Sequence, residues 1–250
     1  MFRRILTTAL LAGFIGGACI SVVQMFTTTP IILHAEQFES KGETDHHHHG
    51  AAPDAGEAQP MAAHASAAGD KAATEHTHAA WAPEDGLERT FFTTMANIIA
   101  GVGFALILAG CFALSGAPVD GRGGVLWGIG GFAAVSLAPS LGLPPEVPGM
   151  MAAELGARQG WWLLCAAATG AGLWMLVFRG GRLVWIAAGI ALLAAPHLLG
   201  APQPARIGGA VPPELAGHFA AASLVTAAVF WSLLGWLTGT FWRRFDGGRV

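Results

Sequence analysis

The segment ILTTALLAGFIGGACISVVQMF, residues 5–26, is apolar apart from threonine, serine and Gln24, and it directly follows the basic pair Arg3-Arg4. Its length is close to the ~20 residues that an α-helix needs to cross the hydrocarbon core of a bilayer. A cleaved signal peptide also has a basic start, but its apolar core usually covers only about 7–15 residues. We therefore expect residues 1–26 to contain a retained transmembrane helix, with a cleaved signal as the alternative.

The composition of the whole chain agrees with a membrane location. Hydrophobic residues make up 53% of the 250 residues and charged residues only 12%, whereas a soluble domain carries about 25% charged residues. Because so few charges cannot cover a water-facing surface, the sequence predicts contact with the lipid bilayer. It contains no HExxH, GxSxG, P-loop or dinucleotide-binding motif, and no basic patch with aromatic residues. We therefore expect neither an enzyme nor a nucleic-acid-binding protein.

Five further apolar segments follow, separated by short breaks rich in Gly, Pro and Arg. They are Phe91–Leu114, Val125–Ala138, Trp161–Phe178, Leu183–Leu199 and Phe219–Trp242. With the first segment they predict an all-α integral membrane fold of about six transmembrane helices, in which residues 91–242 form a five-helix region. The segment Val125–Ala138 is short and needs Gly121–Gly124 or Pro139–Leu141 to complete a crossing, so five spans are the alternative.

The distribution of basic residues predicts how these helices are oriented. With the N-terminus in the cytoplasm, the inner segments hold eight basic and two acidic residues, and the outer segments hold five basic and fourteen acidic residues. Basic residues near the ends of spans favour the cytoplasmic side. We therefore expect both termini inside, with a basic tail over residues 243–250, in a multi-pass protein of a bacterial inner membrane.

The loop over residues 27–90 is the most polar part of the chain and would face the periplasm. From Lys41 to Pro83 it lacks apolar periodicity, so we expect it to be largely disordered after a brief helical continuation from Pro30. Eight of the ten histidines lie in it: His34, His46, His47, His48, His49, His64, His76 and His78. Neutral imidazole binds divalent transition metals, and a flexible tract suits their capture rather than catalysis. The alternative is a polar linker.

The two remaining histidines, His197 and His218, would lie on the same outer face. His197 directly follows Pro196 near the outer end of the fifth span, and His218 opens the sixth span four residues after Glu214. A proline frees backbone groups that can line a polar opening, and ionisable residues near spans usually face a pathway. We expect His197, His218 and Glu214 to offer a metal site at proline-broken helix ends, with helix capping as the alternative.

An internal repeat relates residues 125–178 to residues 183–242. The stretch APSLGLP at 138–144 resembles APHLLGAP at 195–202, and each leads through a proline-rich loop to a Glu-Leu pair. Repeated units are common in transporter folds. We therefore predict three helical hairpins, repeated in the same orientation around a central path.

Two acidic residues each precede an arginine by four positions. Glu154 and Arg158 form one such pair, and Asp85 and Arg89 form the other. Residues with this spacing share a helix face, so we expect two ion pairs at the membrane interface.

Small and uncharged polar residues within the spans predict how helices meet. Asn97 and Gln24 should form hydrogen bonds between helices, with a pore-lining role as the alternative. Pairs of glycines four residues apart fit close helix packing. They are Gly13/Gly17, Gly124/Gly128 and Gly235/Gly239.

Several motifs resemble those of a known family. They are MFRRIL at residues 1–6, PIILHAE at residues 30–36, APSLGLPPE at residues 138–146, Pro196-His197 and Pro213-Glu214-Leu215. With them the chain resembles, over most of its length, the predicted cobalt transporter subunit family CbtA. The resemblance implies an integral membrane protein for cobalt uptake, often linked to cobalamin metabolism. It also implies a small membrane partner, CbtB, with a His-containing terminus.

These patterns together favour the uptake of a divalent metal ion. We expect cobalt as the substrate, with nickel or zinc as alternatives, captured by the His-rich loop and passed to the helix ends. A metal-binding membrane module without transport, such as a sensor or scaffold, is the second hypothesis. An intramembrane enzyme is the third, and it would need a fixed three-ligand metal site with an open position.

Overall fold

The structure, a computed structural model, describes residues 1–45, 83–84, 86–206 and 208–246. These residues form an all-helical fold, as predicted. The elements are α1 (Phe2–Phe26), α2 (Thr28–Asp45), α3 (Leu87–Ser115), α4 (Gly121–Phe132), the π-helical turn η1 (Ala133–Leu137), α5 (Ala138–Ser140), α6 (Leu155–Arg179), α7 (Leu183–Leu199) and α8 (Pro213–Arg244). The described residues include no β-strand, only an isolated bridge between Met150 and Gly209 that joins two loops.

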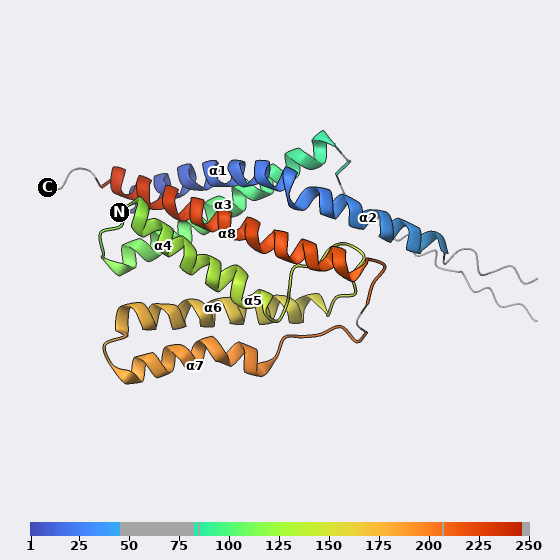
Figure 1. The fold of residues 1–250 in the computed structure, drawn as a ribbon. Coiled ribbons are helices and arrows are strands. Elements are labelled where there is room, and N and C mark those ends of the chain that lie inside the picture. Colours follow the sequence, from blue (N-terminus) through green and yellow to red (C-terminus); the bar gives the residue numbers. More distant parts are fainter. Residues whose placement is uncertain (46–82, 85, 207, 247–250) are drawn as a thin grey trace, which may run out of the picture.

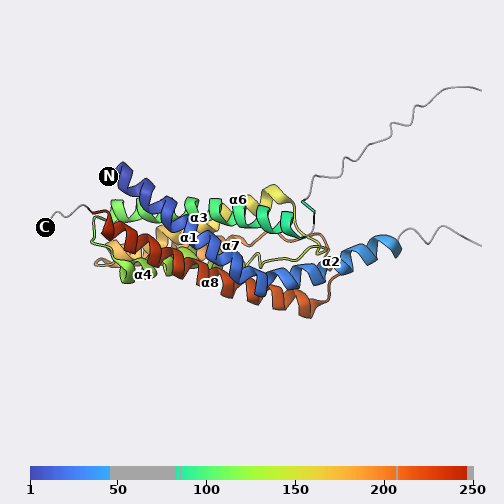
Figure 2. The same cartoon turned by 90° about the horizontal axis from the view of Figure 1, so that it is seen from above.

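Successive crossings alternate in direction, so the bundle has two different ends (Figures 1 and 2). Both termini and the connections α3–α4 and α6–α7 lie at one end, and α2 with the loops before α6 and α8 lies at the other. The first, here called the basic end, carries Arg3, Arg4, Arg122, Arg179, Arg182, Arg243 and Arg244, with Asp120 and Asp246. The second, the acidic end, carries Glu36, Glu84, Glu88, Glu146, Glu154 and Glu214, with Arg89, Arg158 and Arg206. The charges thus separate along the bundle axis.

Five helical segments are long and apolar enough to cross a membrane, by length and composition. They are α1, α3, α6, α8 and the continuous segment Gly121–Ser140. The third crossing therefore gains residues on both sides of Val125–Ala138, as its short apolar core required. The remaining apolar helix, α7, has 17 residues and spans about 25 Å, somewhat less than the ~30 Å hydrocarbon core.

The third crossing continues through Pro139 because a π-helical turn precedes it. Pro139 has no N–H, and in a regular α-helix its ring would clash with the carbonyl of Val135. The turn η1 is wider, since the Ala138 N–H donates to the carbonyl oxygen of Ala133, five residues earlier. The helix then runs on to Ser140. The π-helical turn thus accommodates Pro139, and the helix does not end there.

The helices pack in three close pairs, namely α1 with α3, α4 with α8, and α6 with α7. Helix α8 also packs along α1, which joins the first two pairs. Among the described helices, α7 packs closely only against α6. The predicted hairpins over residues 125–178 and 183–242 are therefore not the closest packed pairs, because the main partner of α4 is α8 and α7 does not pack against α8.

Glycine residues allow the backbones of the paired helices to touch. A Cβ on Gly13 would lie 2.3 Å from the Cα of Val102, and one on Gly101 would lie 2.6 Å from the carbonyl oxygen of Gly13. A Cβ on Gly124 would lie 2.2 Å from the carbonyl oxygen of Gly235, and the reverse distance is 2.3 Å. No larger residue fits at such distances. The close packing predicted for Gly13/Gly17, Gly124/Gly128 and Gly235/Gly239 is confirmed.

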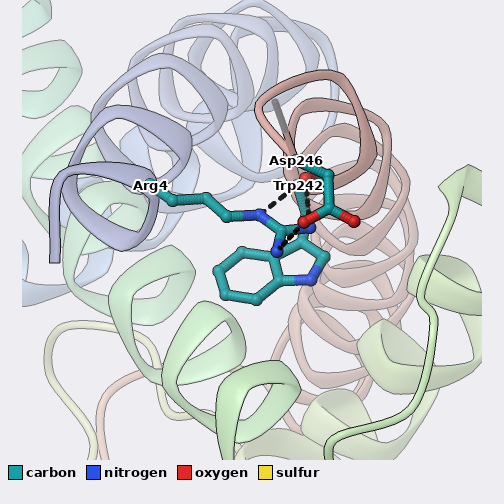
Figure 3. A network of polar contacts seen from close by, with 3 residues as sticks. All are labelled: Arg4, Trp242 and Asp246. Atoms are coloured by element: carbon teal, nitrogen blue, oxygen red, sulfur yellow. Dashed lines mark hydrogen bonds and ion pairs between the residues drawn. The ribbon is translucent and has the colours of Figure 1, made fainter. Parts of the chain in front are cut away.

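Arg4 fastens the first helix to the last at the basic end (Figure 3). Its Nε and Nη2 donate to the carbonyl oxygen of Trp242 at 2.9 and 2.6 Å, and its Nη1 lies 2.5 Å from the Asp246 carboxylate. The guanidinium carbon also lies 3.8 Å from the centre of the Trp242 ring. The Arg4 side chain is only 15% exposed, so water screens these contacts less than it screens a surface ion pair.

Two glycines on α3 provide a matched test of the glycine contacts. Gly101→Ala should lower the free energy of unfolding in detergent by about 1–3 kcal/mol, because the new methyl group overpacks the contact with Gly13. Gly103→Ala is the control, since a Cβ there meets nothing within 4 Å, and it should be neutral or slightly stabilising. Thermal or denaturant unfolding of the purified variants measures the difference. Equal effects at both positions would contradict glycine-mediated packing of α1 on α3.

Candidate functional site

A cavity of about 880 Å³, lined by both apolar and polar side chains, lies towards the acidic end of the bundle, and we call it the acidic-end cavity. Helices α1, α2, α3 and α8 form most of its wall, and η1 and α6 contribute the rest. Its uncharged polar lining consists of Ser21, Gln24, Thr28, Thr29, Thr90, Thr93, Thr94, Asn97, Ser136, Ser223 and Thr226. Arg89 is the one charged side chain among the described residues that line it. Polar groups are costly in hydrocarbon, so their concentration here marks a candidate pathway.

Sequence reasoning missed most of this lining, although a periodic signal was present. On α3 the polar residues Thr90, Thr93, Thr94 and Asn97 follow the spacing i, i+3, i+4 and i+7, which places them on one helix face. The sequence prediction rests on charged and imidazole groups, whereas the uncharged polar part of the lining consists of hydroxyl and amide groups. Only Asn97 and Gln24 were singled out, and for them the pore-lining role was the alternative.

Asn97 ties α3 to α1 at the wall of the cavity. Its amide nitrogen donates to the hydroxyl oxygen of Ser21 at 3.0 Å and to the side-chain oxygen of Gln24 at 2.6 Å. The predicted hydrogen bonding between helices is confirmed, and both residues also line the cavity. Further along α1, the hydroxyls of Thr27 and Thr226 lie 3.2 Å apart and join the helix to α8. These polar contacts thus link α1 and the residue that follows it to α3 and α8.

Aromatic side chains close the cavity towards the basic end. Phe104 of α3 and Trp231 of α8 are the lining residues furthest along their helices in that direction, and their ring centres lie 4.8 Å apart. The Trp231 indole N–H donates to the hydroxyl of Ser136 in η1 at 3.3 Å. Trp231 is buried in an apolar core that includes Leu108, Phe112 and Trp242. The cavity therefore ends on a tightly packed floor.

A second cavity, of about 670 Å³, lies beyond this core at the basic end. Arg4, Asp120, Trp242, Arg243 and Asp246 contribute to its wall. Phe112 and Trp242 belong to both the wall and the core. The two cavities thus lie on opposite sides of one packed layer.

An ion pair between α2 and α3 stands at the acidic end of the first cavity. The two guanidinium nitrogens of Arg89 each contact one carboxylate oxygen of Glu36, with Nη1 and Oε2 3.0 Å apart. Asp85, the partner predicted for Arg89, lies outside the described residues. Both paired side chains are about one-third exposed, at 30% and 33%. Glu36 therefore balances the one charge that Arg89 brings to the cavity wall.

Helix α2 is held over the acidic end by a small apolar cluster. Ile31 and Ala35 on α2 pack with Val147, Val211 and Phe219 from the loops and the start of α8. The helical continuation predicted from Pro30 is thus present, and it reaches Asp45, further than the sequence indicated. Because Phe219 also lines the cavity, α2 is attached directly to the cavity rim.

The structure describes four of the predicted metal ligands. His34 lies exposed on α2, 5.5 Å between ring centres from Phe38. His218 and Glu214 are exposed near the start of α8, and His197 is exposed near the end of α7. Within the described residues, no three His, Cys, Asp or Glu side chains gather closely enough to hold one metal ion. The remaining candidates, His46, His47, His48, His49, His64, His76 and His78, lie outside the described residues.

Pro196 does not break α7, contrary to the sequence prediction. The helix continues to Leu199, and Pro196 is buried within it. Its carbonyl oxygen accepts from the Trp161 indole at 3.2 Å and from the Gly200 N–H at 3.2 Å. The Trp161 ring also meets the His197 ring edge-to-face. Trp161 therefore supports the helix at the position where the sequence suggested an opening.

Glu154 and Arg158 do not form the predicted ion pair. The Glu154 carboxylate caps the first turn of α6, accepting from the N–H groups of Gly156 at 2.8 Å and Ala157 at 2.7 Å. These hydrogen bonds hold the pKa of Glu154 below its usual value. Arg158 instead pairs with Glu146 in the preceding loop at 2.7 Å. The free N–H groups of a helix start compete better for Glu154 than an arginine one turn away.

Comparison with known proteins yields one match. A family model described as "Probable cobalt transporter subunit (CbtA)" matches residues 2–243. Neither the curated proteins nor the solved structures offered a match to the chain. The matched range covers all the described helices except Arg244, the last residue of α8.

A double-mutant cycle tests the Glu36–Arg89 pair. Glu36→Gln, Arg89→Gln and the double variant should show a coupling of roughly 0.5–1 kcal/mol in the free energy of unfolding, since a two-point contact on a partly exposed pair gains modestly. The control cycle is Asp120→Asn with Arg243→Gln, whose charged atoms lie 3.7 Å apart with more exposed side chains. That cycle should give almost no coupling. Equal coupling in the two cycles would contradict a structural role for the Glu36–Arg89 contact.

Proposed function

Because the chain belongs to the CbtA family of probable cobalt transporter subunits, which matches residues 2–243, we propose that it carries cobalt inward across a bacterial inner membrane. It is a multi-pass membrane protein and one subunit of a transporter. In the proposal it moves the ion and catalyses no reaction. Nickel and zinc are alternative substrates, because the imidazole ligands of the loop do not distinguish strongly between these ions.

The observation that carries the proposal is the acidic-end cavity inside a family-matched helical bundle. A divalent ion crossing hydrocarbon must keep polar partners, since an isolated charge is very costly there. The cavity offers hydroxyl and amide groups from α1, α2, α3, η1 and α8 within the bundle. Acidic residues of the described chain gather at the same end, among them Glu36, Glu146 and Glu214, so their field would concentrate cations near its rim.

In the proposed orientation the basic end faces the cytoplasm and the acidic end faces the periplasm. The separation of arginines and carboxylates along the bundle supports this orientation through the positive-inside rule. The ion would then enter the acidic-end cavity first and leave through the cavity at the basic end. The packed layer around Trp231 separates these two spaces, so passage requires the layer to open.

The His-rich segment is proposed to capture ions in front of the cavity. It follows α2, which contacts the cavity rim, and it would deliver ions there by way of His34, His218 and Glu214. His218 directly precedes Phe219, a lining residue. His197 lies on α7 and would act on a separate approach. The second subunit is proposed to be the small membrane protein CbtB, which fits a chain described as a transporter subunit.

Uptake of radioactive cobalt tests the proposal directly. Cells that express the chain together with CbtB should accumulate the label several-fold faster than cells without the chain, at submicromolar cobalt. Competition by unlabelled nickel and zinc ranks the substrates. If the cells bind cobalt at their surface but do not accumulate it, with or without CbtB, the chain is a non-transporting metal-binding module.

A loop variant and two site variants separate capture from passage. Deleting Lys41–Ala80 should raise the cobalt concentration needed for half-maximal uptake several-fold while leaving the maximal rate unchanged, because the loop only concentrates ions. His197→Gln or His218→Gln should lower the maximal rate. The control replaces the seven histidines between residues 46 and 78 by glutamine, which preserves length and charge. Equal effects of loop and site variants on the maximal rate would contradict this division.

A further inference from the structure

We propose that the acidic-end cavity holds the divalent ion with its innermost water shell intact. The protein would then bind the hydrated ion through hydrogen bonds from its water molecules to neutral side-chain oxygens. This inference rests on the proposed metal transport and adds the form in which the ion is carried.

The chemistry of the lining carries the inference. Transition-metal ions exchange their water for imidazole, thiolate or carboxylate ligands. The described residues that line the cavity supply none of these groups, and their polar atoms belong to hydroxyl, amide and indole groups and to Arg89. The Met25 thioether is a lone soft donor. A bare dication would therefore lose more than it gains on shedding its water here.

Asn97 can accept a hydrogen bond from a water molecule bound to the ion. Its amide nitrogen donates to Ser21 and Gln24, so the group it can offer to the cavity is its carbonyl oxygen. The hydroxyls of Thr93 on the same helix face and of Ser223 on α8 add further acceptors to the wall. Water bound to a dication is a strong donor, so oxygen acceptors on two facing helices suit it.

The size of the cavity allows this mode of binding. Six water molecules occupy roughly 180 Å³ at about 30 Å³ each, whereas the cavity measures about 880 Å³. The hydrated ion fits with several further waters. A site built to strip the ion would instead bring its ligands to about 2.0–2.2 Å from the metal.

The charge of Arg89 is compatible with a cation because Glu36 balances it. The bidentate contact neutralises the guanidinium at the cavity wall. The cavity is then attractive through dipoles and the nearby carboxylates, without a direct ligand for the metal. The cavity therefore does not discriminate between cobalt, nickel and zinc through direct coordination.

Hexaamminecobalt(III) tests this inference, because it resembles a hydrated ion in size and shape but does not exchange its ligands. The full chain, carrying Trp81→Phe to remove the loop tryptophan, is placed in lipid nanodiscs and titrated with the complex at fixed ionic strength. Trp162 and Trp231 line the cavity and report binding through quenching of their fluorescence. We expect saturable quenching. The apparent Kd should rise about tenfold or more in Asn97→Leu, and should stay unchanged in Ser115→Ala, a control on the same helix outside the cavity.

Ser223→Ala is a smaller change on the facing helix and should raise the apparent Kd several-fold, which keeps the test decisive if Asn97→Leu does not fold. Quenching that does not saturate, or that is the same in the Ser223→Ala variant and in the parent, would overturn the inference. A second measurement follows labelled cobalt into proteoliposomes and adds the complex as a competitor. Saturable binding without any cobalt uptake would leave the hydrated-ion site standing and refute transport. Cobalt uptake that the complex does not inhibit would refute the hydrated-ion site and leave transport standing.

Discussion

Contact between helix backbones at glycine is the interaction on which the rest of this structure depends. Lipid is as apolar as a leucine side chain, so helices in a membrane gain little from hiding apolar surface. They associate where backbones approach closely and dispersion contacts accumulate. The Gly13–Gly101 contact provides this between α1 and α3, which both line the acidic-end cavity, and the Gly124–Gly235 contact provides it between α4 and α8, of which α8 lines the cavity. Because α1 and α3 touch at Gly13 and Gly101, their ends nearer the acidic end can present polar side chains to a shared space.

The polar residues of the bundle have two roles at once. Asn97, Ser21 and Gln24 satisfy one another between α1 and α3, and they also line the cavity. An uncharged hydrogen-bonded wall costs less to bury than a set of charged ligands. The charged groups lie instead at the bundle ends, where Glu36 pairs with Arg89 and Arg4 pairs with Asp246. The fold thus keeps uncharged polar groups within the bundle and places the charged pairs at its ends.

The sequence predicts the helices well and their neighbours poorly. Apolar runs reveal where the chain crosses the membrane, because each crossing satisfies its own backbone hydrogen bonds. The glycine pairs are confirmed as contact points, but a pattern of small residues does not name its partner, so the packing of α4 against α8 does not follow from the sequence. Pro139 lies within the third helical segment because a π-helical turn precedes it, and Pro196 lies within α7, where its carbonyl oxygen accepts from the Trp161 indole. Both devices depend on residues that the local pattern does not include. Among the candidate ligands, the sequence directed attention to histidine, and the hydroxyl face of α3 was overlooked.

The pairing of α4 with α8 has a consequence for how the chain is made. Helix α1 meets its partner α3 early, since both emerge in the first half of the chain. Helix α4 must wait for α8, and about 100 residues are synthesised in between, which takes roughly 5 to 20 s at ~5–20 residues per second. Throughout this interval the glycine stripe at Gly124 and Gly128 is inserted in the bilayer without its final partner. Assembly factors, or another small-residue helix, have that time in which to bind it, and the last helix to be translated must displace whatever has bound there.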